Sequence, residues 1–385
     1  MIELPASVHA QRLDPSRLPS WAPHHAAKHA LLREYINAWF PKLDFTYDQT
    51  VVIDAFASAG RYAGNQPGSP LVLLHAYAGR SDHHRFKAPP HFIFIESELR
   101  FARHLRAEAD ALGDLRGVRV DVLHGPYEAL FPRVVEYLKA RYRRPLPVFA
   151  LVDPRGYNET PFALLKDYRQ LLGEKAEAMV YLPVNFMARF VMTDLTQNAL
   201  ERCFGSAAAV ERVRANPDYA DLGSGERIAA EYQSLMRREF RFVTQFTIDP
   251  IHHNEYHLFF GTGELEGVRV MKKAYWDVDP VGGSGYVQDP EAAAGQGSLF
   301  DAATTKVLPE EQTLTYLMRQ HFGTREFTFE DAAEWVLLNT RFRDRPHMRQ
   351  MVFLPQQAAD KLRVVRSSRR RTQDFPEGTV MRFVE

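Results

Sequence analysis

Residues 51–62 decide the fold, and they are Val51-Val52-Ile53-Asp54-Ala55-Phe56-Ala57-Ser58-Ala59-Gly60-Arg61-Tyr62. The first half is a short apolar run typical of a buried strand, and small residues dominate the second half. Small side chains after a strand let a ligand lie against the backbone, and Gly60 can adopt the positive φ that such a turn often needs. Because the turn lacks the GxGxxG pattern, it is a poor fit to a phosphate-cradling dinucleotide loop. It is either a ligand-binding turn or a tight strand–helix connection.

Strands and helices alternate on both sides of this stretch. The expected strands are 51–56, 91–96, 118–123, 148–153 and 178–184, and the expected helices are 25–40 (stopped by Pro41), 69–77, 99–112, 127–141 and 162–172. This alternation predicts βαβ units and hence a parallel sheet covered on both faces. After a helix at 228–240, strands 242–248 and 256–261 are too close for a parallel crossover, so they form an antiparallel hairpin. Five parallel strands closed by a hairpin is the order seen in class I methyltransferases.

The chain divides into an N-terminal arm (1–24), a sheet domain (25–279) finished by a helix at 268–278, a linker (280–308) and a C-terminal domain (309–385). Five glycines and little apolar periodicity mark the linker. Beyond it, helices at 310–321, 329–338 and 348–361 precede strands at 363–366 and 380–384. Three short helices followed by a β ribbon predict a winged-helix-like domain.

Composition excludes several classes of protein. The sequence has 385 residues, of which 48 are Lys or Arg and 48 are Asp or Glu, so the formal charge of zero argues against a polycation or an acidic disordered chain. We expect no signal peptide, no membrane partner and a cytoplasmic protein. The single cysteine, Cys203, excludes an internal disulfide and a cysteine-based metal centre on this chain. The histidine pairs 24–25, 83–84 and 252–253 are interpreted as surface residues, and no metal is predicted.

Chemically special residues collect at the expected strand ends, where ligands bind in open parallel sheets. Glu96 ends the second strand, as an acceptor for ribose hydroxyls or as a helix cap. His124 and Gly125 end the third strand, and Asn185 ends the fifth, facing the same cleft. Asp153, Pro154, Gly156 and Tyr157 follow the fourth strand and provide an acceptor, a rigid turn and a stacking ring for a planar amine. The alternative for this last segment is an ordinary β-turn with Pro and Gly in preferred places.

These residues resemble the three-Cys-motif partner (TcmP) family of methyltransferase-like bacterial proteins. The resemblance covers roughly residues 25–385 and rests on the order of several short motifs. They are Lys28-His29 with Trp39, Asp54 with Phe56-Ala57, Gly60-Arg61-Tyr62 and Gly68-Ser69-Pro70, Phe94-Ile95-Glu96, Asp153 to Tyr157, Asn185-Phe186-Met187, and Lys272/Lys273 with Ala274 and Trp276. Ser58-Ala59 stand where the family usually has Gly-Pro, and Pro126 where it tends to have an Asp.

The resemblance implies a Rossmann-like fold that binds S-adenosylmethionine and a three-Cys-motif, radical-SAM-like partner protein. The cofactor would contact Asp54, Phe56, Ala57, Ser58, Gly60, Glu96, His124 and Gly125, and the substrate Arg61, Tyr62 and Asn185. Two hypotheses remain. One is a methyltransferase acting on a nucleic-acid base or another planar amine, and the other is a catalytically degenerate fold that serves as a scaffold, which the Ser58-Ala59 and Pro126 departures favour. In the expected wing, Arg369, Arg370 and Arg371 either contact nucleic-acid phosphates, form a solvated hairpin tip or pair with acidic residues.

Overall fold

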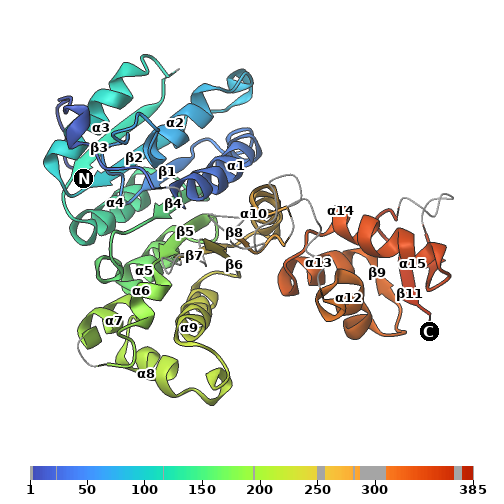
Figure 1. Ribbon diagram of the computed structural model, residues 1–385. Helices are drawn as coiled ribbons and strands as arrows, with labels where there is room; N and C mark the ends of the chain where they lie inside the picture. Colours follow the sequence, from blue (N-terminus) through green and yellow to red (C-terminus); the bar gives the residue numbers. More distant parts are fainter. Residues whose placement is uncertain are drawn as a thin grey trace. The chain divides into compact units, whose positions relative to one another are not determined.

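The computed structural model describes residues 3–22, 24–115, 117–193, 196–248, 256–280, 282–286, 309–367 and 375–384. The chain forms two compact units. The first unit comprises the described residues of 1–264 and 285–289. The second unit comprises the described residues of 265–284 and 290–385. Figure 1 follows the elements in chain order.

The first unit is built on one mixed sheet with the order β3-β2-β1-β4-β5-β7-β6-β8. Its parallel strands are β1 (Val51–Asp54), β2 (His91–Glu96), β3 (Arg119–His124), β4 (Val148–Val152) and β5 (Ala176–Leu182). The hairpin of β6 (Phe242–Ile248) and β7 (Tyr256–Thr262) lies antiparallel against β5, and β8 (Gly285–Tyr286) pairs parallel with β6. The predicted set of five parallel strands closed by a hairpin is confirmed, and with it the class I methyltransferase topology.

Helices cover both faces of this sheet (Figure 1). Alternate strand residues such as Ile53, Ile95 and Ala150 share one core with the helices α4 (Tyr127–Arg141), α5 (Phe162–Leu172) and α9 (Ser224–Glu239). The opposite face contacts α1 (His24–Asp44), which adjoins α2 (Ser69–Ala78), itself adjoining α3 (Leu99–Ala111). Sequence analysis did not predict three short helices after β5, namely α6 (Val184–Ala188), α7 (Gln197–Phe204) and α8 (Ala207–Ala215).

Helix α1 does not stop at Pro41, as expected, but continues to Asp44. A proline inside a helix removes the N–H that would bond the carbonyl four residues earlier, here that of Asn37. The guanidinium of Arg80 replaces it, with its Nη1 donating to Asn37 O at 2.9 Å. Asp82 in turn holds Arg80 through two hydrogen bonds of 2.8 and 2.6 Å. A side chain from outside the helix therefore satisfies the carbonyl that Pro41 leaves without a donor.

A buried carboxylate anchors the same helix to the sheet. Glu177 of β5 accepts hydrogen bonds from Tyr35 Oη at 2.7 Å, from Trp39 Nε1 at 2.8 Å and from Thr262 Oγ1 of β7 at 2.5 Å. Burial raises the pKa of Glu177, and these three donors counter that effect. The contacts fix the middle of α1 over β5 and β7.

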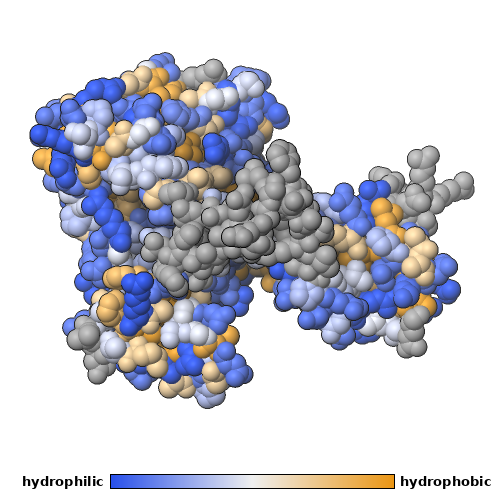
Figure 2. All heavy atoms as spheres, in the orientation of Figure 1, coloured by the Kyte–Doolittle hydropathy of each residue, from blue (hydrophilic) through white to orange (hydrophobic). Residues whose placement is uncertain are grey.

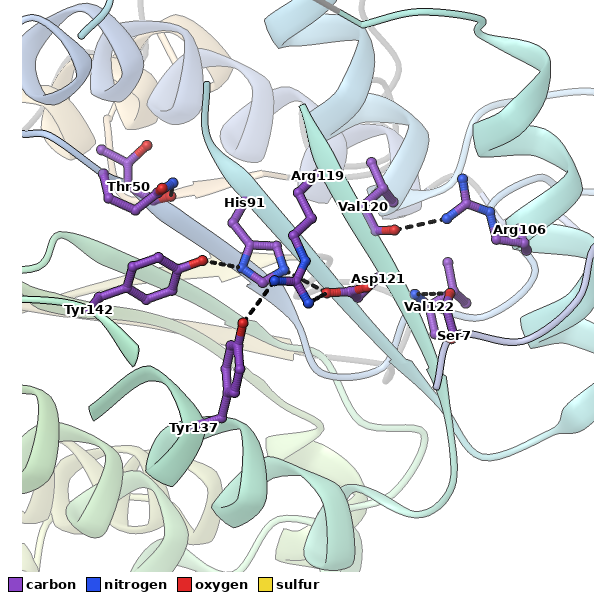
Figure 3. A network of polar contacts seen from close by, with 11 residues as sticks. Ser7, Thr50, His91, Arg106, Arg119, Val120, Asp121, Val122, Tyr137 and Tyr142 are labelled. Atoms are coloured by element: carbon purple, nitrogen blue, oxygen red, sulfur yellow. Dashed lines mark hydrogen bonds and ion pairs between the residues drawn. The ribbon is translucent and has the colours of Figure 1, made fainter. Parts of the chain in front are cut away.

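At the amino ends of the strands, a polar network ties the sheet edge together (Figure 3). His91 Nε2 lies 2.8 Å from Asp121 Oδ2 and its Nδ1 lies 3.0 Å from Tyr142 Oη. Arg119 donates to Tyr137 Oη at 2.8 Å and pairs with Asp121 at 2.7 Å. The network connects β2 and β3 to α4 and the residue after it, so it is a structural device remote from the carboxyl ends of the strands.

The N-terminal arm is ordered over residues 3–22 and follows the outer edge of β3. Val8 N–H donates to Val122 O at 3.1 Å, and Ser7 Oγ bonds the same residue. Further along, Leu13 N–H donates to His104 Nδ1 at 2.9 Å. The arm thus protects an edge strand, as natural sheets require, before it reaches α1.

The second unit begins with α10 (Leu265–Val278), which we expected to complete the sheet domain; that assignment is corrected. Lys272 Nζ donates to the carbonyls of Val336, Thr340 and Phe342, and Trp276 Nε1 donates to Arg341 O at 2.9 Å. These bonds cap the end of α13 (Phe329–Asn339), and burial lowers the pKa of Lys272 to about 7. Trp276 of α10 also belongs to the hydrophobic core of the second unit.

The remainder of this unit has α12 (Leu314–Phe322) and a three-stranded antiparallel sheet. The strand order is β10-β11-β9, with β9 at Phe327–Thr328, β10 at Leu362–Arg366 and β11 at Val380–Phe383. Instead of one helix over 348–361, the chain forms α14 (Arg345–His347), a π-helix (Met348–Phe353) and α15 (Leu354–Ala358). Arg369, Arg370, Arg371 and nearly all of the expected linker lie outside the described residues.

Candidate functional site

A cavity of about 850 Å³ opens at the carboxyl ends of β1, β2 and β4. Its sheet side is formed by the segment after β1, by Glu96 at the end of β2, and by Gly125 and Asp153 beyond β3 and β4. Its other side comes from the arm and the first turns of α1. The lining residues on that side are Arg17, Leu18, Pro19, Ser20, His24, His25, Lys28 and His29. The structure thus has a cavity at the strand ends where the sequence predicts a ligand site.

The turn after β1 is tight and has two residues in the left-handed region of backbone conformation. Ser58 and Gly60 have φ values of 52° and 75°, both in the left-handed region. Ala57 N–H donates to Ile95 O at 2.9 Å, and Gly68 N–H donates to Gly60 O at 2.7 Å. A Cβ on Gly60 would lie 2.6 Å from Leu105 Cδ1. The backbone of this turn is thus held tightly between β2 and the start of α2.

Two carboxylates lie at or below this turn. Glu96 is only 5% exposed and lines the cavity, and its Oε1 accepts the N–H of Glu98 at 2.7 Å. No described residue donates to its Oε2. Asp54 lies beneath the turn, where its Oδ1 accepts the N–H of Phe56 at 3.2 Å and its Oδ2 has no partner among the described residues. Burial raises the pKa of Asp54 to about 7.

Asp153 is paired with a lysine, Lys28, whose place at the site was not predicted from the sequence. Lys28 Nζ of α1 donates to Asp153 Oδ1 at 2.7 Å, and the lysine is 5% exposed. The same ammonium group lies 4.6 Å from the ring centroid of Tyr181 and 4.2 Å from that of Tyr256. Asp153 Oδ2 and the carbonyl of Pro154 accept no hydrogen bond from a described residue. One oxygen of Asp153 is therefore engaged, and two acceptors remain beside it.

A cluster of four rings, Trp21, His25, His29 and Tyr62, stands on the α1 side of the cavity. Trp21 lies with its ring centroid 5.4 Å from each histidine and 5.0 Å from Tyr62, and His25 stacks on Tyr62 at 5.0 Å. His25, His29 and Tyr62 line the cavity, and Trp21 packs behind them. Tyr62 was predicted as a substrate residue, whereas the histidines were not. Their four-residue spacing, which gives one helix face, was the signal that sequence analysis left unused.

Several predicted site residues do not reach the cavity. Tyr157 was expected to stack on the substrate, but it is 4% exposed and belongs to the main core. Asp54, Gly156 and His124 are absent from the cavity wall; Asp54 is fully buried and His124 is exposed. Asn185 does not end a strand, because Pro183, which lacks an N–H, follows β5 and α6 begins at Val184. These placements correct the roles assigned to them.

Other predicted site residues lie at the cavity, whereas the prediction for the histidines holds only in part. Phe56, Ala57, Ser58, Gly60, Arg61, Gly125 and Pro154 all line the cavity. Arg61 is held by Glu108 at 2.7 Å and by Asn65. The interpretation of the histidine pairs as surface residues is wrong for His83, which is buried and bonds Tyr77 O. His25 is half-buried on the cavity wall, and the pair 252–253 lies outside the described residues. Cys203 is fully buried, and burial raises the pKa of its thiol to about 12, so this cysteine is inert.

Within the described residues, no three His, Cys, Asp or Glu side chains come together as a metal-binding group. In the same part of the chain, no helix combines the length and the apolar character that crossing a membrane would require. Hydrophilic side chains cover most of the described surface in view in Figure 2. Among the larger exposed apolar side chains are Phe186 and Met192.

No protein-family profile and no curated protein matches this sequence. Solved structures do show similarity. The complex of Trm1 from Pyrococcus horikoshii with S-adenosyl-L-methionine matches 69% of this chain at 12% identity and a TM-score of 0.33, and the match spans 62% of the Trm1 chain, less than two thirds. The O-methyltransferase TomG from Streptomyces achromogenes, in complex with SAM, matches 64% of this chain at 15% identity and a TM-score of 0.31, over 93% of its own length. The METTL16 MTase domain matches 60% at 12% identity and a TM-score of 0.31, over 66% of its length.

Proposed function

We propose that this chain is an S-adenosylmethionine-dependent methyltransferase that acts on a nitrogen of a nucleic-acid base or of another planar amine. The observation that carries the proposal is the 850 Å³ cavity, which joins the β1 turn and Glu96 to the acceptors at Asp153-Pro154 in one space. Its volume is near the upper end of the roughly 300–1,000 Å³ typical of small-molecule sites. There is accordingly room for a cofactor and an acceptor group side by side.

The residues present fit the cofactor. Glu96 offers an unpartnered Oε2 in a buried position, where hydrogen bonds to hydroxyl groups of a ribose are strongest. Asp54 is buried just below the turn and does not line the cavity, so it supports the backbone of the turn from beneath. Phe56, Ala57, Ser58, Gly60 and Gly125 would hold the rest of the molecule against the backbone. When bound, the cofactor supplies an activated methyl group.

The acceptor side has to orient an N–H rather than ionise it. Asp153 Oδ2 and the Pro154 carbonyl can each accept a hydrogen bond from the target amine. Lys28 holds Asp153 through its other oxygen, so the carboxylate cannot turn away from the cavity. Positioning of this kind supplies a large part of the acceleration in transfer reactions that need no covalent intermediate.

Isothermal titration calorimetry with S-adenosylmethionine tests the proposal. The variant Glu96→Ala should weaken binding by about 1–3 kcal/mol, because charge-assisted hydrogen bonds to the ribose are lost. Asp110→Ala is the matched control, since that carboxylate lies at the far end of α3, pairs with Arg106 and does not line the cavity. Unchanged affinity in a folded Glu96→Ala protein would contradict the site. A parent chain that binds no cofactor would favour the scaffold hypothesis instead.

For the second unit we propose a winged-helix domain that contacts nucleic acid or a partner protein. The strand order β10-β11-β9 with α12 and α13 beside it supports this assignment. Arg363 and Arg366 of β10 are exposed, at the start of the segment that leads to Arg369–Arg371. A three-Cys-motif, radical-SAM-like protein as partner rests on the family resemblance.

A further inference from the structure

We propose that His25, His29 and Tyr62, backed by Trp21, bind the acceptor group, and that this group is an uncharged planar heteroaromatic ring of the nucleobase type. The inference rests on the proposed function, because it names the half of the cavity that the cofactor leaves open. It also replaces Tyr157, which the structure removes from the site.

The first argument is shape. His25, His29 and Tyr62 present three rings to the cavity from two separate segments, α1 and the loop after β1. His25 and Tyr62 are nearly parallel at 27°, while Trp21 packs edge-on against Tyr62 at 84°. A wall made of ring faces and ring edges suits another flat ring, which can stack or meet the edges. A flexible aliphatic amine has no flat face that could stack on these rings.

The second argument is hydrogen bonding. His25 Nδ1 accepts the N–H of Ala22 at 3.1 Å, which leaves its proton on Nε2 as a donor. His29 is 8% exposed and lines the cavity, yet neither of its ring nitrogens has a partner among the described residues. A neutral imidazole has one donor and one acceptor, and on the cavity wall both of those of His29 are available to a ligand. A ligand edge that carries a donor next to an acceptor would satisfy them.

The third argument is charge. Burial lowers the pKa values of His25 and His29 to about 4, so both rings are neutral at physiological pH. The nearest cation, Lys28, is already paired with Asp153 at 2.7 Å. Arg33, the other positive group that acts on His29, lowers its pKa further. The three rings therefore carry no charge of their own, although Arg17 and Arg61 line other parts of the cavity. A neutral wall of rings favours a neutral heterocycle over an anionic or a cationic one.

The experiment is a titration of adenosine, cytidine, guanosine and uridine into the full-length chain saturated with S-adenosylhomocysteine, so that nucleosides cannot occupy the cofactor half. Binding is followed by tryptophan fluorescence and by calorimetry, with ribose as the non-aromatic probe. We expect at least one nucleoside to bind and ribose not to bind. The variant His29→Phe, which keeps a ring but loses both nitrogens, should weaken nucleoside binding at least tenfold and change the affinity for S-adenosylhomocysteine less than twofold.

His124→Phe is the matched control, because His124 is exposed and outside the cavity wall, and it should bind nucleosides like the parent. If His29→Phe does not fold, His29→Gln and Tyr62→Leu give the same comparison. The inference is overturned if no nucleoside binds the loaded parent, if ribose binds equally well, or if His29→Phe binds like the parent. If the parent protein binds no S-adenosylhomocysteine, the proposed function is contradicted instead. The nucleoside titrations of the parent and of His29→Phe then test the binding role of the rings without the cofactor.

Discussion

Replacing Asp153 by Ala should destabilise the first unit as well as impair the site, because the structure gives this carboxylate a buried partner. Lys28 would lose its only carboxylate within 4 Å among the described residues and would remain as an unpaired buried charge. Breaking a fully buried ion pair costs about 3–5 kcal/mol. From the sequence, Asp153 is expected to act towards the substrate, so that its loss would affect transfer more than stability; the buried partner adds a cost in stability.

The magnitude follows from the surroundings. The side chain of Asp153 is 29% exposed, so solvent already screens part of the attraction. Lys28 also keeps its contacts with the rings of Tyr181 and Tyr256, at 4.6 and 4.2 Å, and such contacts are worth about 0.5–2 kcal/mol. We therefore expect a net loss of about 2 kcal/mol. For a unit of this size that is roughly 4–8 °C in Tm.

Differential scanning calorimetry of Asp153→Ala, Lys28→Met and the double variant measures the effect. In the double variant the unpaired ammonium is gone, so its Tm should return close to that of Lys28→Met, with a coupling of about 2 kcal/mol between the two changes. The control pair is Lys175 and Glu264, 2.6 Å apart but with side chains 27% and 47% exposed, where we expect at most about 1 kcal/mol. If the Tm losses of Lys28→Met and Asp153→Ala simply add, the pair is not coupled and the reasoning is wrong.

Three further predictions concern the elements that position the site. Arg80→Ala leaves the carbonyl of Asn37 without a donor beside Pro41, so Tm should fall by the equivalent of about 1–3 kcal/mol; an unchanged Tm would mean that water replaces the guanidinium without loss. The pKa of His29 is about 4 in the folded chain and 6.5 as a free side chain, so the unfolded state binds more protons between these values. Stability from this group is present above pH 6.5 and is lost as the pH falls towards 4, and His29→Gln should therefore flatten the decline of Tm between pH 7 and 5; equal slopes for variant and parent would contradict it. Ser58 has a φ of 52°, and replacing it by Gly removes a backbone strain of about 1–2 kcal/mol. The added conformational entropy of the unfolded chain costs about 0.5–1 kcal/mol, so the Tm of Ser58→Gly should rise slightly. A lower Tm would show that the Ser58 side chain makes a stabilising contact.

The sheet half of the site could be predicted from the sequence because its signals are local. Apolar runs define β1, β2 and β4, and the residue after each run necessarily lies at the same edge of a parallel sheet. This is why Glu96 and the turn after β1 were placed correctly. Several helix ends were also foreseeable, such as those of α3, α4 and α5. The end of α1 was not, because Arg80 satisfies the carbonyl that Pro41 leaves without a donor.

Side-chain direction within a turn could not be predicted in the same way. Asp153 and Tyr157 are four residues apart, yet one lines the cavity and the other lies in the core. Which way each points depends on the backbone dihedrals of Pro154, Arg155 and Gly156, and composition does not determine these. The partnership of Lys28 with Asp153 was equally hidden, since 125 residues separate the two. Likewise, the apolar face of α10 has the same periodicity whichever unit it packs against.

Helix α1 links the core of the first unit to its cavity. Its middle turns are fixed to the sheet through Tyr35, Trp39 and Glu177, and its end is completed by Arg80. Its first turns carry His25, Lys28 and His29 into the cavity. Since a helix is stiff over this length, the position of the first turns is set by the anchored turns behind them. The polar residues at the start of α1 are thus presented to the ligand by a rigid support, which is the arrangement that a site working by orientation requires.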